Sequence, residues 1–104
     1  MKTLALIFLY LGLTTFSWGL RTVVIDAGHG GHDKGGSWGK VYEKHLALDT
    51  AFRLERYLKN AGYRVVMTRR SDRYLTLGQR VAIGNKYKDA IFVSIHSNLS
   101  LIHI

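Results

Sequence analysis

The chain has 104 residues, and its 47% hydrophobic and 21% charged residues are typical of one globular domain rather than of a disordered chain. It contains no cysteine, which excludes disulfides, a thiol nucleophile and a cysteine-ligated metal, so any metal must be bound by His, Asp or Glu. The net charge of +8 favours anionic partners, but the basic residues are spread without the dense block typical of nucleic-acid binding, so no nucleic-acid partner is expected.

The first nineteen residues, 1–19, have the pattern of a secretory signal peptide. Lys2 precedes an apolar run from Leu4 to Leu13. Small residues at Ser17 and Gly19 provide a cleavage site. The run is shorter than the roughly 20 residues that span a bilayer, so no stable membrane insertion is expected after cleavage. We therefore expect an exported protein, in the periplasm, the extracellular space or the cell wall.

A β-branched apolar run at residues 22–25 predicts a strand that is buried on both faces, as in parallel sheets. It leads into Asp26 and then into a glycine-dense loop that contains His29, His32 and Asp33. Because glycine tolerates positive φ, this loop can turn tightly and approach a ligand closely.

Helical spacing follows from about Lys44 to Ala61, where apolar residues recur on one face: Ala47, Ala51, Leu54 and Leu58. Gly62 supplies a C-terminal stop, and residues 64–68 predict a second strand. Thr76 and Gln79 have the spacing of a capping box and predict a helix that reaches about Lys86.

Residues 90–95 predict a third buried strand, which ends at His96. The order β-α-β-α-β predicts an α/β fold with a parallel sheet flanked by helices and right-handed crossovers.

Two histidines stand at the carboxyl ends of predicted strands, His29 after the first and His96 after the third. Parallel α/β sheets bind ligands at this edge, and a crossover helix begins there, which brings Glu43 to the same place. Taken singly, these are ordinary loop, strand-end and helix N-terminal residues. Together, His29, Glu43 and His96 are predicted to bind Zn²⁺, which in hydrolytic sites commonly takes three such ligands and leaves one position for water.

Other side chains near the glycine loop could take part. Asp26 could orient His29, although an Asp that ends a strand more often caps a turn. Three more could compete for ligand roles: His32, Asp33 and His45. His45 is expected on a different face of its helix from Glu43, at the surface or on the substrate side.

Five motifs follow one another between Thr22 and Asn98: residues 24–31, Glu43–Lys44, Thr68–Arg69 with Asp72, Leu77 with Arg80, and residues 92–98. In order and approximate spacing they resemble those of the zinc-dependent N-acetylmuramoyl-L-alanine amidases of the Amidase_3 type. The resemblance implies a hydrolase that cleaves the amide bond between N-acetylmuramic acid and L-alanine in peptidoglycan. It also implies that the zinc ligands are the three residues already singled out, His29, Glu43 and His96.

The resemblance has departures and further implications. Ala27 and Lys34 stand where the family often has proline, which changes loop stiffness rather than chemistry. At the motif positions of Arg69, Asp72 and Arg80 we expect structural side chains rather than substrate contacts.

Members of that family continue beyond the third ligand and carry a general-base glutamate near the end of the domain. The two glutamates here are Glu43, assigned to the metal, and Glu55, which lies mid-helix, so the catalytic residue is unknown and is expected downstream. We interpret residues 20–98 as the N-terminal part of a catalytic domain and residues 99–104 as a non-native tail encoded by a sequencing adapter. The chain alone is then expected to be inactive and marginally folded.

Two alternatives to the enzyme remain. The first is a non-catalytic module that binds zinc or the cell wall, consistent with the missing general base. The second is a phosphate-binding α/β domain, disfavoured because the glycines match neither standard phosphate-loop spacing. Nothing in the sequence indicates the oligomeric state or the preferred peptidoglycan.

Overall fold

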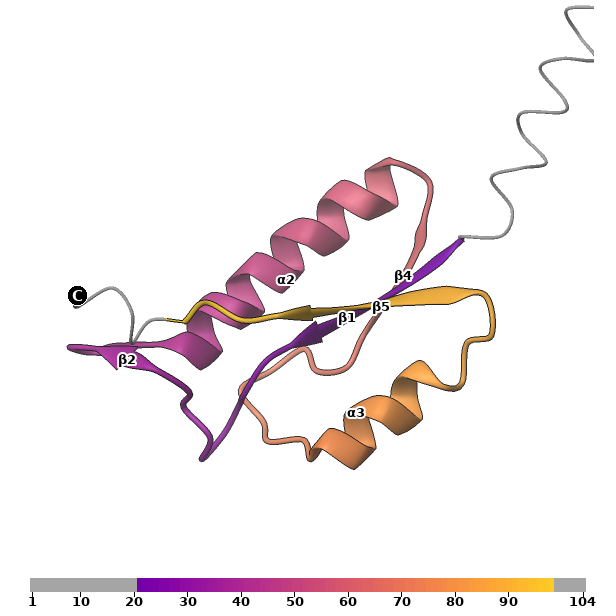
Figure 1. Cartoon of the computed structure of the whole chain (residues 1–104). Coiled ribbons are helices and arrows are strands. Elements are labelled where there is room, and N and C mark those ends of the chain that lie inside the picture. Colours follow the sequence, from indigo (N-terminus) through magenta and orange to yellow (C-terminus); the bar gives the residue numbers. More distant parts are fainter. Residues whose placement is uncertain (1–20, 99–104) are drawn as a thin grey trace, which may run out of the picture.

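A computed structural model describes residues 21–98, in which a parallel three-stranded sheet lies between two helices (Figure 1). Helix α2 (Glu43–Asn60) covers one face of the sheet and α3 (Leu77–Gly84) lies on the other. The strand order is β4 (Arg64–Met67), β1 (Thr22–Ala27), β5 (Ala90–Ile95). The predicted α/β class, with a parallel sheet flanked by helices, is confirmed.

The predicted signal peptide at residues 1–19 and the predicted tail at residues 99–104 lie outside the described residues. Within residues 21–98, none of the helices has the length and apolar character needed to cross a bilayer.

Strand β1 is the central strand and is enclosed on every side. It pairs in parallel with β4 over Thr22–Ile25 and with β5 over its whole length. Val24 and Ile25 are fully buried, which explains why the sequence shows a continuous apolar run rather than alternation.

Alternate residues of β1 form the hydrophobic core against α2. Val23, Ile25 and Ala27 pack against Ala47 and Ala51, which lie one helical turn apart on α2. The small alanine side chains let the helix approach the sheet closely. Larger side chains surround this contact: Leu48, Leu54, Leu58, Val65, Met67, Val93 and Ile95.

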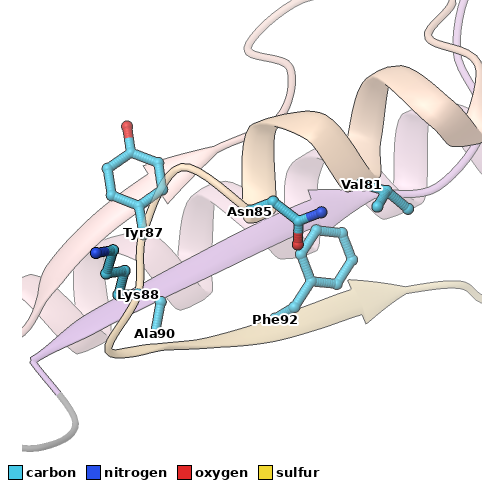
Figure 2. A pocket seen from close by; sticks show the side chains of 7 residues that line it. Val81, Asn85, Tyr87, Lys88, Ala90 and Phe92 are labelled. Atoms are coloured by element: carbon cyan, nitrogen blue, oxygen red, sulfur yellow. The ribbon is translucent and has the colours of Figure 1, made fainter.

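The face that carries α3 is more open. A groove between α3 and β5 is lined by Val81, Gly84, Asn85, Tyr87, Lys88, Ala90 and Phe92. Figure 2 shows the Phe92 ring lying close to Asn85 and Val81 at the end of the helix. Phe92 and Val81 remain 43% and 49% exposed, so this side of the sheet is only partly covered within residues 21–98.

The predicted boundaries agree with the structure to within two residues. Gly62 has φ +94°, as the predicted helix stop requires. Thr76 and Gln79 form the predicted capping box, with both reciprocal hydrogen bonds present. The sequence did not predict the short hairpin of β2 (Ser37–Trp38) and β3 (Val41–Tyr42), because strands of two residues are too short to show a period.

Candidate metal centre

Three side chains from separate elements meet at the carboxyl edge of the sheet, as predicted. His29 Nε2 lies 2.9 Å from Glu43 Oε2, and His96 Nδ1 lies 3.2 Å from each of these atoms. The two imidazole rings are nearly perpendicular, with centroids 4.9 Å apart. Two ring nitrogens and one carboxylate oxygen therefore form a small triangle.

This triangle fits a zinc ion. Ligand atoms about 2.0–2.1 Å from a tetrahedral zinc ion lie roughly 3.3 Å from one another, so three of them form a triangle of nearly this size. Histidine nitrogen and glutamate oxygen are also the donors that zinc takes in hydrolytic enzymes. Without a cation or a shared proton, three atoms that carry lone pairs would repel one another at these distances. The residues present thus suit a divalent metal.

The sheet register places the two histidines side by side. Ala27 of β1 pairs with Ile95 of β5, and the Gly28 N–H continues the ladder by donating to the Ile95 carbonyl at 2.9 Å. A Cβ at residue 28 would lie 2.5 Å from the His96 ring, so glycine is needed for the close approach of this ring to β1. The two imidazoles therefore leave the sheet at one edge.

His29 itself adopts a left-handed backbone conformation, with φ +64°. This conformation costs roughly 1–2 kcal/mol for a residue with a side chain, and surrounding contacts must hold it. The Arg80 guanidinium donates to the His29 carbonyl at 2.8 Å. The backbones of Gly30 and Asp33 exchange hydrogen bonds of 2.8 and 3.0 Å, which closes the loop after the histidine.

Glu43 is the first residue of α2 and is 4% exposed. Burial alone would raise the pKa of Glu43. Hydrogen bonds from the backbone N–H groups of Gly36 and Ser97, together with the nearby His29, outweigh burial and lower the pKa to about 2. Glu43 is therefore ionised at neutral pH, as a metal ligand must be.

Asp33 contacts the far side of the His29 ring. Its Oδ2 lies 3.0 Å from His29 Nδ1, and its Oδ1 accepts a hydrogen bond from the Gly35 N–H at 3.1 Å. The hydrogen bond with His29 lowers the pKa of Asp33. The i, i+4 spacing from His29 to Asp33 is a sequence signal that could have identified this contact.

The idea that Asp26 orients His29 is wrong. The Asp26 carboxylate instead accepts hydrogen bonds from Thr68, Arg80 and Ser94 at 2.7, 2.8 and 3.0 Å. It ties β1 to its two neighbouring strands and to α3.

The structural roles expected for Arg69 and Asp72 are confirmed, as is that of Arg80. Arg69 is 2% exposed and donates to the carbonyls of Ala27, Gly28, Lys44 and Ser71. Burial lowers the pKa of Arg69. Asp72 accepts from the Gly31 N–H and from Lys44 Nζ, both at 2.8 Å. These side chains fasten the loop that carries His29 to its surroundings.

The other candidate ligands do not join the triangle. His32 stacks on Tyr74, with ring centroids 4.2 Å apart, and His45 is exposed near Tyr42, with centroids 6.2 Å apart. His103 lies outside the described residues. Within residues 21–98, the one cluster of three metal-binding side chains that the structure contains is His29, Glu43 and His96.

An open hollow adjoins the centre. Its lining includes His29 and His96 together with Tyr74 and Leu77. The groove of Figure 2, between α3 and β5, has no histidine or carboxylate in its lining. Of these two, the first hollow is the one that adjoins the candidate metal centre.

Comparisons with known proteins indicate the family of this chain. A family model described as N-acetylmuramoyl-L-alanine amidase matches residues 23–101. The amidase AmiC of Neisseria meningitidis is 43% identical over 77 residues, which are 73% of this chain and 18% of that protein. The chain thus spans less than a fifth of the length of this relative.

Two solved structures are similar in fold as well as in sequence. The catalytic domain of CwlV, an N-acetylmuramoyl-L-alanine amidase from Bacillus (Paenibacillus) polymyxa, has a TM-score of 0.71 and 44% identity, covering 75% of this chain and 45% of that one. Cwp6 from Clostridium difficile has a TM-score of 0.72 and 46% identity, covering 75% of this chain and 13% of that one. The chain belongs to the N-acetylmuramoyl-L-alanine amidase family.

Proposed function

We propose that the chain binds one Zn²⁺ ion through His29, Glu43 and His96 and serves in the hydrolysis of peptidoglycan. The bond cleaved is the amide between N-acetylmuramic acid and L-alanine. The observation that supports this most is the triangle of three donor atoms at the carboxyl edge of the sheet, in a chain of the amidase family.

The residues of the chain would hold the ion and leave one side of it open to the substrate. Glu43 supplies a buried negative charge, and the side chains of His29 and His96, 21% and 47% exposed, face the adjoining hollow. When bound, zinc lowers the pKa of a water molecule and polarises a carbonyl oxygen. In the overall reaction water adds hydroxyl to the lactyl carbonyl carbon and a proton to the leaving amine of L-alanine.

No general base is identified within residues 21–98. The carboxylates near the centre are all engaged, Asp26 by Arg80, and Asp33 and Glu43 by the histidines. We propose that the base lies outside these residues. A specific alternative follows from the same observation, namely that the chain binds zinc and the wall without turnover.

We also propose that the protein acts in the periplasm or at the cell wall after export by a signal peptide at residues 1–19. Loss of residues 1–19 removes one charged side chain, Lys2, so the net charge falls from +8 to +7 and still suits an acidic wall polymer.

Metal analysis and an amine-release assay test the proposal. The purified protein is expected to hold one zinc per chain. His29→Ala, Glu43→Ala and His96→Ala should each lose the metal, whereas His32→Ala and His45→Ala should keep it as matched controls. Hydrolysis would free the α-amino group of L-alanine, which can be labelled and identified.

The outcomes separate the possible functions. Zinc retained in all three ligand variants would contradict the assigned site. Zinc and peptidoglycan binding with no L-alanine amine released, even by the full-length gene product, would favour the non-catalytic module.

A further inference from the structure

We infer that Asp33 is a positioning residue that fixes the tautomer and orientation of His29 and thereby strengthens zinc binding. The inference rests on the zinc site proposed above and adds a residue that the ligand set does not contain.

The two nitrogens of His29 face different partners. Nε2 faces Glu43 at 2.9 Å, and Nδ1 faces Asp33 at 3.0 Å. An ionised carboxylate can only accept a hydrogen bond, so Nδ1 carries a proton toward Asp33. Between Nε2 and the ionised Glu43 carboxylate, a zinc ion would take the place of a proton. With zinc bound, the Nε2 lone pair would be directed to the ion while Nδ1–H donates to Asp33, which is the tautomer that a metal ligand requires.

Asp33 is itself held in place. Its second oxygen accepts from the Gly35 N–H, and its backbone N–H and carbonyl are both bonded to Gly30. A Cβ at residue 35 would lie 2.6 Å from the His29 ring, so the loop presses against the imidazole. The carboxylate is therefore a fixed acceptor rather than a mobile surface group, although its side chain is 43% exposed.

The two histidines of the centre differ in this respect. His96 uses Nδ1 toward the centre, and within residues 21–98 no hydrogen bond is made to its Nε2. Within the described part of the chain, a carboxylate thus orients His29 at the nitrogen that faces away from the centre, and His96 has no such partner. Among the described residues, the orienting contribution to zinc affinity thus falls on Asp33.

Zinc affinity in three variants tests this inference. We would titrate the wild-type protein, Asp33→Ala, Asp33→Asn and Asp49→Asn against a zinc-binding dye at pH 7. A carboxylate that hydrogen-bonds to a metal-binding histidine typically contributes 10–100-fold to metal affinity. Because Asp33 is partly exposed, its contribution should lie near the lower end of that range. Asp33→Ala should therefore bind zinc roughly tenfold more weakly. Asp33→Asn keeps an acceptor and loses the charge, so it should be intermediate.

Asp49→Asn is the matched control because Asp49 is an exposed carboxylate on α2 that pairs with Arg53 and belongs neither to the triangle nor to the lining of the hollow. Its zinc affinity should equal that of the wild type. If Asp33→Ala does not fold, as judged by circular dichroism, Asp33→Asn alone decides the test.

Nitrogen-15 spectra of the imidazoles give a readout that general loosening would not mimic. In the zinc-loaded wild-type protein, the proton on His29 Nδ1 should be strongly deshielded by its hydrogen bond to Asp33. This shift should be smaller in Asp33→Asn and smallest in Asp33→Ala. Unchanged zinc affinity and an unchanged Nδ1–H proton shift in the Asp33 variants would overturn the inference while leaving the zinc site intact. A wild-type protein that binds no zinc would instead overturn the proposed function itself.

Discussion

The two faces of strand β1 are built in opposite ways. Val23, Ile25 and Ala27 face α2 in a closed apolar core, whereas Asp26 faces the α3 side and is held by Arg80 through charged hydrogen bonds. The hydrophobic contacts on the apolar face have no preferred direction, and the stability that they provide depends on how completely the core is filled. The hydrogen bonds on the polar face are directional, because each carbonyl and carboxylate there accepts from a specific donor.

We therefore expect the apolar face to contribute to the stability of the fold, and the polar face to contribute both to stability and to the position of His29. Arg80 donates to the carbonyls of Ala27, His29 and Leu75 as well as to Asp26, so it reaches the backbone of a proposed metal ligand. Damage to the polar face should therefore weaken both folding and zinc binding. Damage to the apolar face should weaken folding alone.

The largest effect is expected for Arg80→Met. It leaves the Asp26 carboxylate without its cation in a buried site and removes the Arg80 donor from the His29 and Leu75 carbonyls, while the Ala27 carbonyl keeps Arg69. The free energy of unfolding should fall by about 4 kcal/mol. Urea titration measures this loss. Zinc affinity of the folded fraction should also fall, because the His29 carbonyl loses its donor.

Arg80→Lys sharpens this prediction. Lysine keeps the charge near Asp26 but lacks the planar fork, so it cannot serve the Asp26 carboxylate and the carbonyls together. It should recover part of the stability and less of the zinc affinity. Equal recovery of both would argue that the charge alone matters.

Ile25→Ala breaks the apolar face instead. Ile25 is fully buried beneath α2, and truncating such a side chain typically costs about 3 kcal/mol through lost burial and the cavity left behind. Zinc affinity of the folded protein should stay at the wild-type value. A parallel loss of affinity would show that the two faces are not independent. Ile25→Val, with a cost of about 1 kcal/mol, is the graded control.

Thr76→Ala tests how much the N-terminal cap of α3, the helix that carries Arg80, contributes to stability. The Thr76 hydroxyl accepts from the Gln79 N–H at 3.1 Å, and loss of such a cap typically costs about 1 kcal/mol. Thermal unfolding should show the loss. Thr76→Ser keeps the hydroxyl and should be nearly neutral, so a large loss in that variant would assign the effect to packing.

The smallest effect is pH-dependent and concerns the apolar side. Arg70 donates to Glu55 of α2 at 2.6 and 3.1 Å and lowers the pKa of Glu55 below its usual value of 4.5. A carboxyl with a depressed folded pKa stabilises the fold above its unfolded pKa, and this stabilisation is lost as pH falls through the folded pKa. Because Arg70 is well exposed, Glu55→Gln should cost about 0.5–1 kcal/mol at pH 7.

The pH series identifies the cause of that effect. The difference in unfolding free energy between Glu55→Gln and the wild type should shrink progressively as pH falls below 4.5. A difference that persists at pH 2 would point to packing rather than charge. Asp49→Asn, which removes an exposed pair with Arg53, should change stability less at every pH.

The sequence predicted the helices and strands whose apolar residues recur with a regular period or whose ends carry capping residues. The apolar run of β1, the alanine face of α2 and the capping box at Thr76 each follow from local chemistry. The meeting of His29, Glu43 and His96 could be predicted because the topology of a parallel sheet brings strand ends and helix starts to one edge.

The remaining contacts depend on loop conformation, which residue spacing does not specify. Asp26 and Asp33 are both three or four positions from His29, and only the left-handed turn at His29 decides which carboxylate faces the ring. The destinations of the Arg69 and Arg80 donors are mostly carbonyls, which every residue possesses. Such bonds leave no pattern in the amino-acid sequence.

The close fit of Gly28 and Gly35 against the two imidazole rings has a consequence for how an ion enters. Both rings are confined by backbone before any metal arrives, so little of the binding free energy is consumed in ordering the ligands. The centre is then preorganised, unlike a zinc finger, whose chain folds around its ion. A chelator should strip the metal while leaving the circular dichroism spectrum unchanged, and added zinc should restore the loaded form without refolding.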